Sequence, residues 1–388
     1  MRFSIQKYLS LWLVVLMLCA FFPYSATNAA EPPFSMGSAT AIVVVARSSL
    51  QIIVQRELDT VNPVAGLSRI GPMLILSEAI DKGDYSLDGK VTISANAAKV
   101  PGPTAFVEAN EVISADDLYK SAVMISAGDA LYALCEAAFG SMDVFLSKLN
   151  NRMQDMGVQA VYQDPMGTNL KMSVSDLAKI GSALANSTAF KRYSTTYMSE
   201  IIHSNGERTE LVNPNRFVRD LVGCTGLMTG SSNDAGYCGA FSVSRNGADY
   251  VAVVLGAKNS ADRFEVARAA IEYAYASYKN VNIAKKGDAI IKGVPISGSV
   301  MRAVDLVALN ELSILSGMND EQPNAVYNVP QALIAPIKAG DCLGTVDYFN
   351  SQGERLATLE LGVETDIEPA TFSDFLSMLL SFWVCIRG

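Results

Sequence analysis

The sequence predicts an α+β fold, with an antiparallel sheet flanked by helices, followed by a small all-β domain and a terminal amphipathic helix. Two observations predict this fold class. Strand-like runs lie at both ends of 34–280 with helical patterns between them, which is typical of a sheet covered by helices. From 281 to 368, short β-like runs alternate with Gly, Pro and Asn turns, which indicates a separate β domain. The chain has 388 residues, half of them hydrophobic, and is long enough for both cores.

The first 29 residues are predicted to be a secretory signal. Arg2 and Lys7 precede an apolar run over 9–22, and Thr27-Asn28-Ala29 has the small residues of a cleavage site. The apolar run is short for a stable membrane span, so we expect removal rather than anchoring. The mature protein is therefore expected to be exported.

The charge balance limits the partners of the chain. Its formal net charge is −9, and this becomes −11 when the two positive charges of the signal are removed. An acidic protein of this kind is not expected to bind nucleic acid, and it gains little from attraction to anionic lipid.

Cysteine and histidine usage gives no metal or cofactor site. Five cysteines remain after the signal, their spacing matches no zinc pattern, and we expect most to be buried thiols, although export would permit one disulfide. The single histidine, His203, stands in a polar stretch and is expected to be a surface residue. Ser-His-Asp chemistry could rest only on that residue, and a multi-histidine metal site is excluded.

The large domain begins with strands and continues with helices. The β-branched runs at 40–46 and 50–54 predict a hairpin. After a break at Asn62-Pro63, the apolar spacing of 67–80 predicts a buried helix, and Ser114 has the chemistry of a helix cap. A short strand is expected at 91–94, and further helices are expected at 116–124, 129–138, 142–156 and 173–185.

Strands return in the second half of this domain. They are expected at 222–229, 236–245 and 248–257, and the last two are joined at Asn246-Gly247, a type I′ hairpin signal. A long helix over 263–278 closes the domain. In the β domain, strand-like runs lie at 289–291, 299–303, 305–309, 325–328, 344–349 and 357–361.

The last segment, 369–388, contains an apolar stretch over 372–386. Ser373, Ser377 and Ser381 lie four apart and form a narrow polar stripe. At roughly 15 residues the stretch is too short to span a bilayer as a straight helix. It suits a helix lying on the outer face of the cytoplasmic membrane with Trp383 and its apolar neighbours buried. The alternative is a helix docked on the β domain.

Several segments of the chain follow one another in the order of a known family. They are Pro63-Val64-Ala65, 87–94 with 96–98, 111–118, 128–136, Asp164-Pro165-Met166-Gly167, 173–178 and Asn213-Pro214-Asn215. With the strand-turn-strand at 221–238, they resemble the penicillin-binding, low-molecular-mass serine D-Ala-D-Ala carboxypeptidases, a beta-lactamase/transpeptidase-like family. The resemblance covers nearly everything after the signal, and it implies the same fold.

The three reactive motifs of that family are altered here. The family's Ser-x-x-Lys corresponds to Gly66-Leu67-Ser68-Arg69, its Ser-x-Asn to Ser126-Ala127-Gly128, and its Lys-Thr-Gly to Met228-Thr229-Gly230. In the family, the serine attacks the carbonyl beside the terminal D-alanine and the lysine one turn later takes its proton. The resemblance also implies that the second motif relays protons and holds the substrate amide, and that the third lysine attracts the terminal carboxylate.

These substitutions remove the groups on which the reaction depends. Gly66 has no hydroxyl on which an acyl-enzyme could form, and the Arg69 guanidinium stays protonated and cannot act as the base. Gly128 removes an amide that would orient the substrate, and Met228 removes a charge. In a helix, the side chain of Ser68 points about 200° away from the direction of a side chain at position 66. The residue three positions after Ser68 is Gly71, which cannot act as a base.

Some of the same residues could still bind a ligand. Arg69 and Ser126, with Thr229 and Gly230, could form donors for a carboxylate or another anion. Alternatively, Arg69 pairs with a nearby acidic side chain and fills the place of the lysine.

Three functions are therefore predicted from the sequence. The favoured one is an exported cell-envelope protein without turnover, which binds or scaffolds near peptidoglycan, with a stem peptide or an envelope protein as partner. The second is a working serine carboxypeptidase with a displaced nucleophile, Ser68. The third is a structural protein that acts through its β domain and terminal segment.

Overall fold

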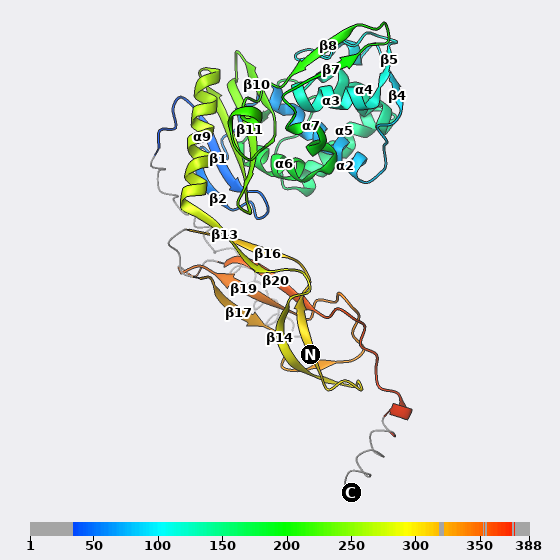
Figure 1. The fold of residues 1–388 in the computed structure, drawn as a ribbon, viewed down its shortest axis with the longest axis vertical. Coiled ribbons are helices and arrows are strands. Elements are labelled where there is room, and N and C mark those ends of the chain that lie inside the picture. Colours follow the sequence, from blue (N-terminus) through cyan, green and yellow to red (C-terminus); the bar gives the residue numbers. More distant parts are fainter. Residues whose placement is uncertain (1–33, 318–321, 352, 354, 375, 377–388) are drawn as a thin grey trace, which may run out of the picture. The chain divides into compact units, whose positions relative to one another are not determined.

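The computed structural model describes residues 34–317, 322–351, 353, 355–374 and 376 (Figure 1). The predicted signal, residues 1–29, lies outside these residues. What is described confirms the α+β fold class, with helices, antiparallel sheets and a C-terminal β domain.

The main sheet is antiparallel, and β1 lies inside it. Its strands follow the order β10-β11-β12-β1-β2, and β9 also pairs with β11. The strands are β1 (Ala41–Ala46), β2 (Ile52–Arg56), β9 (Cys224–Gly226), β10 (Thr229–Ser232), β11 (Gly236–Arg245) and β12 (Ala248–Ala257). The predicted turn at Asn246-Gly247 joins β11 to β12, and both of its residues have positive φ, +51° and +76°.

Both faces of this sheet are buried. Val43 and Val45 of β1 pack into the cluster that contains the central helices, whereas Ile42 and Val44 pack on the other side against α9 (Ser260–Ser277). All six residues of β1 are buried, which explains its uninterrupted apolar run. Figure 1 shows α9 and α6 (Val174–Asn186) on the two sides of β1.

The helices of the central region begin and end close to the predicted positions. A short helix, η1 (Ala65–Arg69), leads into the buried helix α2 (Ile70–Asp81). The others are α3 (Ala115–Ile125), α4 (Gly128–Phe139), α5 (Met142–Asp155), α6 (Val174–Asn186), α7 (Thr188–Ser194) and α8 (Phe217–Asp220). Serine side chains cap several of them, and the predicted cap at Ser114 accepts a hydrogen bond from the backbone N–H of Asp117.

Short strand pairs lie around these helices. β3 (Asn62–Pro63) pairs with β6 (Lys171–Met172), and β4 (Lys90–Thr92) pairs with β5 (Val112–Ser114). The hairpin of β7 (Met198–Ile202) and β8 (Arg208–Val212) was not predicted. The single strand expected at 222–229 is wrong, because Leu227 and Met228 separate β9 from β10.

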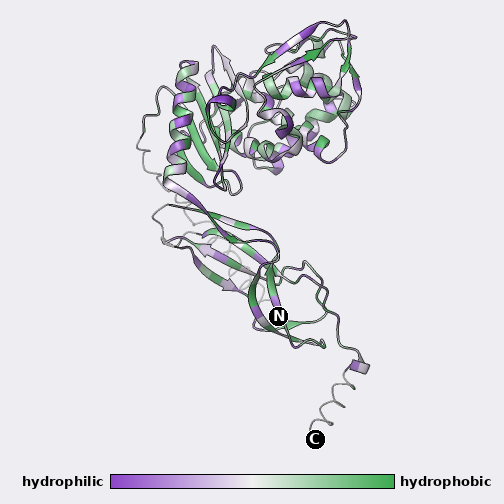
Figure 2. Cartoon of the chain, in the orientation of Figure 1, coloured by the Kyte–Doolittle hydropathy of each residue, from purple (hydrophilic) through white to green (hydrophobic). Residues whose placement is uncertain are grey.

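The C-terminal domain contains one six-stranded sheet with the order β17-β19-β20-β15-β14-β18. Its strands are β14 (Ala289–Ser297), β15 (Ala303–Ala308), β17 (Asn324–Asn328), β18 (Leu333–Ile334), β19 (Gly344–Phe349) and β20 (Arg355–Gly362). The strand expected at 299–303 is wrong, because residues 299–302 belong to the turn between β14 and β15, and β15 begins only at Ala303. Two further strands, β13 (Tyr278–Ala284) and β16 (Leu312–Gly317), pair with each other. Figure 2 shows apolar and polar residues alternating along these strands.

The terminal segment is described only at its start. Residues 372–374 and 376 are helical, whereas 375 and 377–388 lie outside the described residues, so most of the predicted amphipathic helix is not tested. Within the described residues, no single helix has the length and hydropathy needed to cross a membrane. The bent pair α4 and α5 meets that test only by joint length and composition, with 95° between its members.

Candidate functional site

The first altered motif lines a cleft beside the edge strand of the main sheet, and the other two lie next to it, where Gly66 approaches Gly230 and Arg69 binds the carbonyl of Ser126. The cleft has a volume of about 390 Å³. η1, the loop at 100–103, the loop at 166–171 and β10 provide its walls, which include Gly66, Ser68, Arg69, Pro101, Gly102, Pro103, Lys171, Ser231 and Asp234. The fold therefore brings together the first motif and the strand of the third, which lie more than 150 positions apart.

Gly66, which the resemblance aligns with the family's nucleophile, has no side chain, although there is room for one. Gly66 lies in η1, and a Cβ built on it would have the Gly230 Cα at 3.5 Å and the Thr229 carbonyl oxygen at 3.8 Å as its nearest atoms. Both are ordinary contact distances. The hydroxyl is thus missing because of the residue type, not because of crowding.

Ser68, the displaced nucleophile of the second predicted function, lies two positions further on in η1. Its side chain is buried, and its hydroxyl donates to the carbonyl of Met166 at 2.9 Å. Its own carbonyl accepts a hydrogen bond from the Tyr162 hydroxyl at 2.8 Å. Within the described residues, the Ser68 hydroxyl has no hydrogen bond to a basic side chain.

Arg69, which the sequence resemblance aligns with the family's lysine, binds three backbone carbonyls. Its Nη1 donates to Ser126 at 2.5 Å and to Pro103 at 3.5 Å, and its Nη2 donates to Pro101 at 2.6 Å. Among the described residues it makes no ion pair, so the expectation that it pairs with an acidic side chain is wrong. Burial lowers the pKa of the guanidinium, and the negative charge of Asp129 acts in the opposite direction.

The guanidinium fits because two neighbouring positions are glycines. A Cβ on Gly128 would lie 2.7 Å from Nη2 and 2.8 Å from Cζ of Arg69, and a Cβ on Gly102 would lie 2.8 Å from the same Nη2. The larger head group at 69 therefore occupies space that the side chain of the second motif would need. The side chains that can be accommodated at 69 and at 128 therefore depend on each other.

Gly128→Asn is expected to lower the free energy of unfolding by about 1–3 kcal/mol, because the added side chain would overpack the space held by Arg69 and Val100. Urea denaturation measures this loss. Gly89→Asn is the matched control, because a Cβ there would meet nothing within 4 Å. Arg69→Lys should reduce the cost of Gly128→Asn, with a coupling energy of about 0.5–3 kcal/mol. An equal cost in both backgrounds would show that the two positions are independent.

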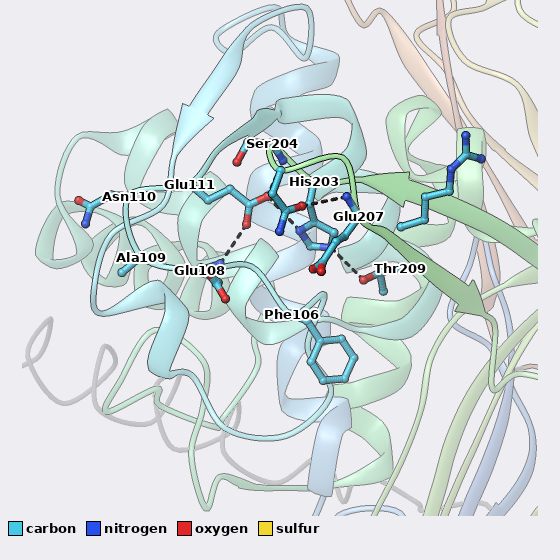
Figure 3. Close-up of a pocket in the computed structure, with 11 residues that line it drawn as sticks. Phe106, Glu108, Ala109, Asn110, Glu111, His203, Ser204, Glu207 and Thr209 are labelled. Atoms are coloured by element: carbon cyan, nitrogen blue, oxygen red, sulfur yellow. Dashed lines mark hydrogen bonds and ion pairs between the residues drawn. The ribbon is translucent and has the colours of Figure 1, made fainter.

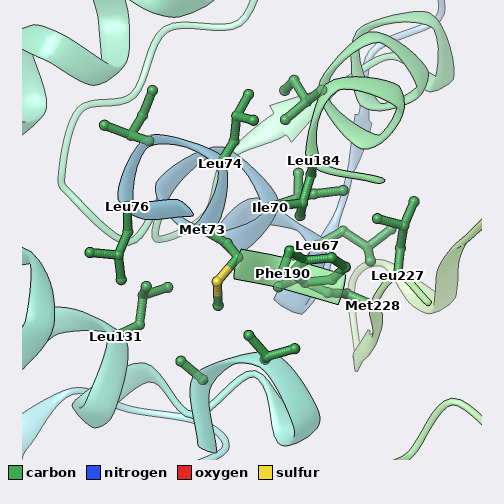
Figure 4. Packing of buried hydrophobic residues seen from close by; sticks show 14 of the residues in the cluster. Leu67, Ile70, Met73, Leu74, Leu76, Leu131, Leu184, Phe190, Leu227 and Met228 are labelled. Carbon is green, nitrogen blue, oxygen red and sulfur yellow. The ribbon is translucent and has the colours of Figure 1, made fainter. Parts of the chain in front are cut away.

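In the segment that resembles the third motif, the uncharged side chain of Met228 lies in the hydrophobic core. Met228 is 2% exposed, and Figure 4 shows it beside Phe190 and Leu227. Thr229 and Gly230 follow in β10, where they pair with Gly239 and Cys238 of β11. A Cβ on Gly230 would lie 2.6 Å from the backbone nitrogen of Gly66, so only glycine permits this close approach of β10 to η1.

One cation beside the cleft was missed from the sequence. Arg263, in the first turn of α9, donates from Nη1 to the carbonyls of Gly230 at 3.3 Å and Cys238 at 3.0 Å. Its Nε is buried and has no partner among the described residues. Burial lowers its pKa to about 10. A positive charge near a helix N-terminus is electrostatically unfavourable, and this placement could have marked the residue.

His203 lies in a second, separate pocket of about 230 Å³ (Figure 3). Its Nδ1 is 2.9 Å from Oε1 of Glu111 and its Nε2 is 2.8 Å from Oγ1 of Thr209. The prediction of a surface residue is wrong, because its side chain is 9% exposed. Burial acts to raise the pKa of Glu111, but hydrogen bonds from the backbone of Glu108 and Ser204 and from His203 hold it below its ordinary value. The network fastens the β7–β8 turn to the loop before β5.

The cysteines and acidic residues form no further centre in the described part of the chain. Cys135 and Cys238 are buried, Cys224 is partly buried and Cys342 is exposed, and all four are free thiols. No group of three His, Cys, Asp or Glu side chains is placed to hold a metal ion among the residues described. Cys19 and Cys385 lie outside them.

The α+β fold with its C-terminal β domain, and the close approach of the segment at 66–69 to β10 at the edge of the main sheet, are typical of penicillin-binding serine peptidases. The chain belongs to the D-alanyl-D-alanine carboxypeptidase family, peptidase S11, whose family model matches residues 26–259. Residues 278–369 match the model of the C-terminal domain of penicillin-binding protein 5. This confirms the family that the motifs of the sequence resemble.

Curated relatives cover almost the whole chain. The D-alanyl-D-alanine carboxypeptidase DacF of Bacillus subtilis (strain 168) is 24% identical over an alignment of 386 residues that covers 97% of this chain and 99% of the relative. DacC of Escherichia coli (strain K12) is 24% identical over an alignment of 382 residues that covers 93% of this chain and 92% of the relative.

Solved structures share the fold. Penicillin-binding protein 5 from Haemophilus influenzae has a TM-score of 0.75 and 21% identity, covering 87% of this chain and 99% of its own. A peptidoglycan synthesis regulatory factor, PBP3, from Streptococcus pneumoniae has a TM-score of 0.67 and 20% identity, covering 86% of this chain and 100% of its own.

Proposed function

We propose that this protein is an exported, non-catalytic member of the carboxypeptidase family that binds or scaffolds in the cell envelope. In this proposal the predicted signal directs export, and residues 372–386 hold the protein on the outer face of the cytoplasmic membrane. The cleft binds a peptidoglycan stem peptide or an envelope protein without hydrolysing it.

The observation that carries the proposal is the glycine at position 66. The resemblance of the sequence to the family aligns this residue with the attacking serine, and the hydroxyl of Ser68, two positions further on, donates to the backbone carbonyl of Met166. Removing a nucleophile costs about 10⁶ in kcat in another serine hydrolase, and further losses in the same machinery overlap rather than add. Binding and positioning can survive such a loss, because they use other contacts.

The surroundings of Arg69 also support a cleft without turnover. Its guanidinium is held by the carbonyls of Pro101, Pro103 and Ser126 and cannot leave without losing charge-assisted hydrogen bonds. In this proposal Arg69 and Ser126 shape the floor of the cleft, and a bound peptide contacts Thr229 and Gly230 on β10. We also propose that the guanidinium of Arg69 and the hydroxyl of Ser126 donate hydrogen bonds to a carboxylate or another anion of the bound partner.

Purified protein incubated with a fluorescent penicillin is expected to show no covalent label that survives denaturation, because an ester needs a hydroxyl at the reactive position. Gel fluorescence measures the label, and an active carboxypeptidase of the family is the positive control. Stable labelling that disappears in Ser68→Ala would instead establish the displaced-nucleophile enzyme. Release of D-alanine from a pentapeptide, abolished by the same substitution, would have the same meaning.

A further inference from the structure

One corner of the C-terminal domain exposes apolar side chains from three separate segments. Val300 and Met301 lie in the turn between β14 and β15 and are about half exposed. Ile334 ends β18 and is 76% exposed, and Phe372 opens the terminal segment and is 83% exposed. We call these four residues the apolar corner.

Backbone pairing brings the three segments together. Ser297 pairs with Ile334 in the parallel ladder of β14 and β18, and the N–H of Ala335 donates to the carbonyl of Ser297 at 2.9 Å. The N–H of Ala370 donates to the carbonyl of Gly298 at 2.8 Å. The turn at 298–302 and the start of the terminal segment are thus held next to each other at the same end of the sheet.

The terminal segment starts as a helix whose first turn is capped by its own residues, Thr371 and Asp374. The N–H of Thr371 donates to the carboxylate of Asp374 at 2.9 Å, and the N–H of Asp374 donates to the Thr371 hydroxyl at 3.3 Å. This reciprocal pair is a capping box, which sets where the helix begins. Leu376 in the next turn is also exposed, so the described start of the segment does not cover the apolar corner.

We propose that the apolar corner is a second membrane contact, which rests on the lipid surface together with residues 372–386. The sequence of 377–388 supplies the apolar residues Met378, Leu379, Leu380, Phe382, Trp383, Val384 and Ile386 directly after the corner. A lipid surface is the partner that accepts both, since it buries apolar side chains from a turn and a following segment in one plane. This inference rests on the proposed membrane placement of the terminal segment.

Charge around the corner predicts how the contact forms. The adjoining segments carry Arg302 and Lys338 against Asp341, Asp366 and Glu368. Anionic headgroups add no binding free energy to a surface with this charge balance. The burial of apolar side chains is therefore expected to drive membrane binding. Binding should therefore be similar on phosphatidylcholine vesicles and on vesicles that contain phosphatidylglycerol, and it should change little with salt.

A single tryptophan can report on each part separately. The mature chain from residue 30 has one tryptophan, Trp383, and its fluorescence follows the terminal segment. Met301→Trp in a Trp383→Phe chain moves the reporter to the apolar corner. Val326→Trp in the same background is the matched control, because Val326 is 48% exposed on β17, at the opposite edge of the sheet.

On adding phosphatidylcholine vesicles, we expect the reporter at 301 to shift to shorter wavelength and to be quenched by brominated lipid, while the reporter at 326 stays unchanged. Met301→Glu should weaken vesicle binding of the mature chain about tenfold, a change of about 1.4 kcal/mol. Val326→Glu should leave it unchanged.

The outcomes separate this inference from the proposed membrane placement. If Trp383 responds to vesicles but the reporter at 301 does not, the terminal segment binds lipid and the apolar corner does not. If neither responds, both proposals fail. If the reporter at 301 is already shifted without vesicles and loses that shift when residues 376–388 are deleted, the terminal segment covers the corner within the protein and the inference is overturned.

Discussion

Gly66→Ser, Arg69→Lys and Gly128→Asn together are expected to restore covalent labelling by a fluorescent penicillin. The serine supplies the attacking oxygen at a position with room for it, and the lysine can lose a proton, which a guanidinium cannot. The asparagine then enters the space that the shorter lysine leaves free. A nucleophile and its base are worth up to about 10⁶ in rate in another serine hydrolase, so the gain over the starting protein should be large.

Two controls separate the parts of this effect. The triple variant with Gly66→Ala in place of Gly66→Ser should not label, because no ester can form. Gly66→Ser alone should label far more slowly than the triple variant, because Arg69 remains as a permanent cation. Equal labelling of the single and triple variants would show that Arg69 and Gly128 are not what blocks the reaction. A folded but unreactive triple variant would place the block elsewhere in the cleft.

Met228→Lys is expected to lower the free energy of unfolding by about 3–5 kcal/mol at pH 7, because it buries an ammonium without a partner among Leu67, Phe190 and Leu227. Burial lowers the pKa of such a lysine in the folded state. The loss is therefore complete below that lowered pKa, and it shrinks as the pH rises toward the ordinary lysine value of about 10.4. Urea denaturation at pH 7 and pH 10 measures both effects.

Met228→Leu is the conservative control and should cost less than about 1.5 kcal/mol, because volume and polarity change little. If Met228→Lys unfolds like the parent at both pH values, the side chain at 228 is free to turn into the cleft. The third motif could then be restored by one substitution, and the core would not oppose it. This result would weaken the view that the cleft has been absorbed into the hydrophobic core.

The long apolar runs of β1 and α2 predicted these elements well because both elements are buried on all their faces. β1 and α2 are buried along most of their length, so almost every residue carries a signal. The hairpin of β7 and β8 was missed for the opposite reason. Only Ile201 and Leu211 are buried in it, and two buried positions among ten residues do not make a visible period.

The positions that correspond to the reactive motifs were predicted from the sequence because the neighbouring segments resemble those of the family. Their environment was not accessible. The carbonyls that bind Arg69 come from Pro101, Pro103 and Ser126, more than 30 positions away, and such backbone groups have no signature in residue type. The same holds for His203, whose partner Glu111 lies 92 positions earlier in the chain.

By itself, the sequence determined the fold class and family, the absence of a hydroxyl at 66 and the permanent cation at 69, because these follow from residue identity and order. Only the tertiary structure decided that Arg69 and Gly128 share one space, that Met228 belongs to the core and that the apolar corner is formed at all. Those facts depend on which distant segments touch, and contact between distant segments is set by packing of the whole chain.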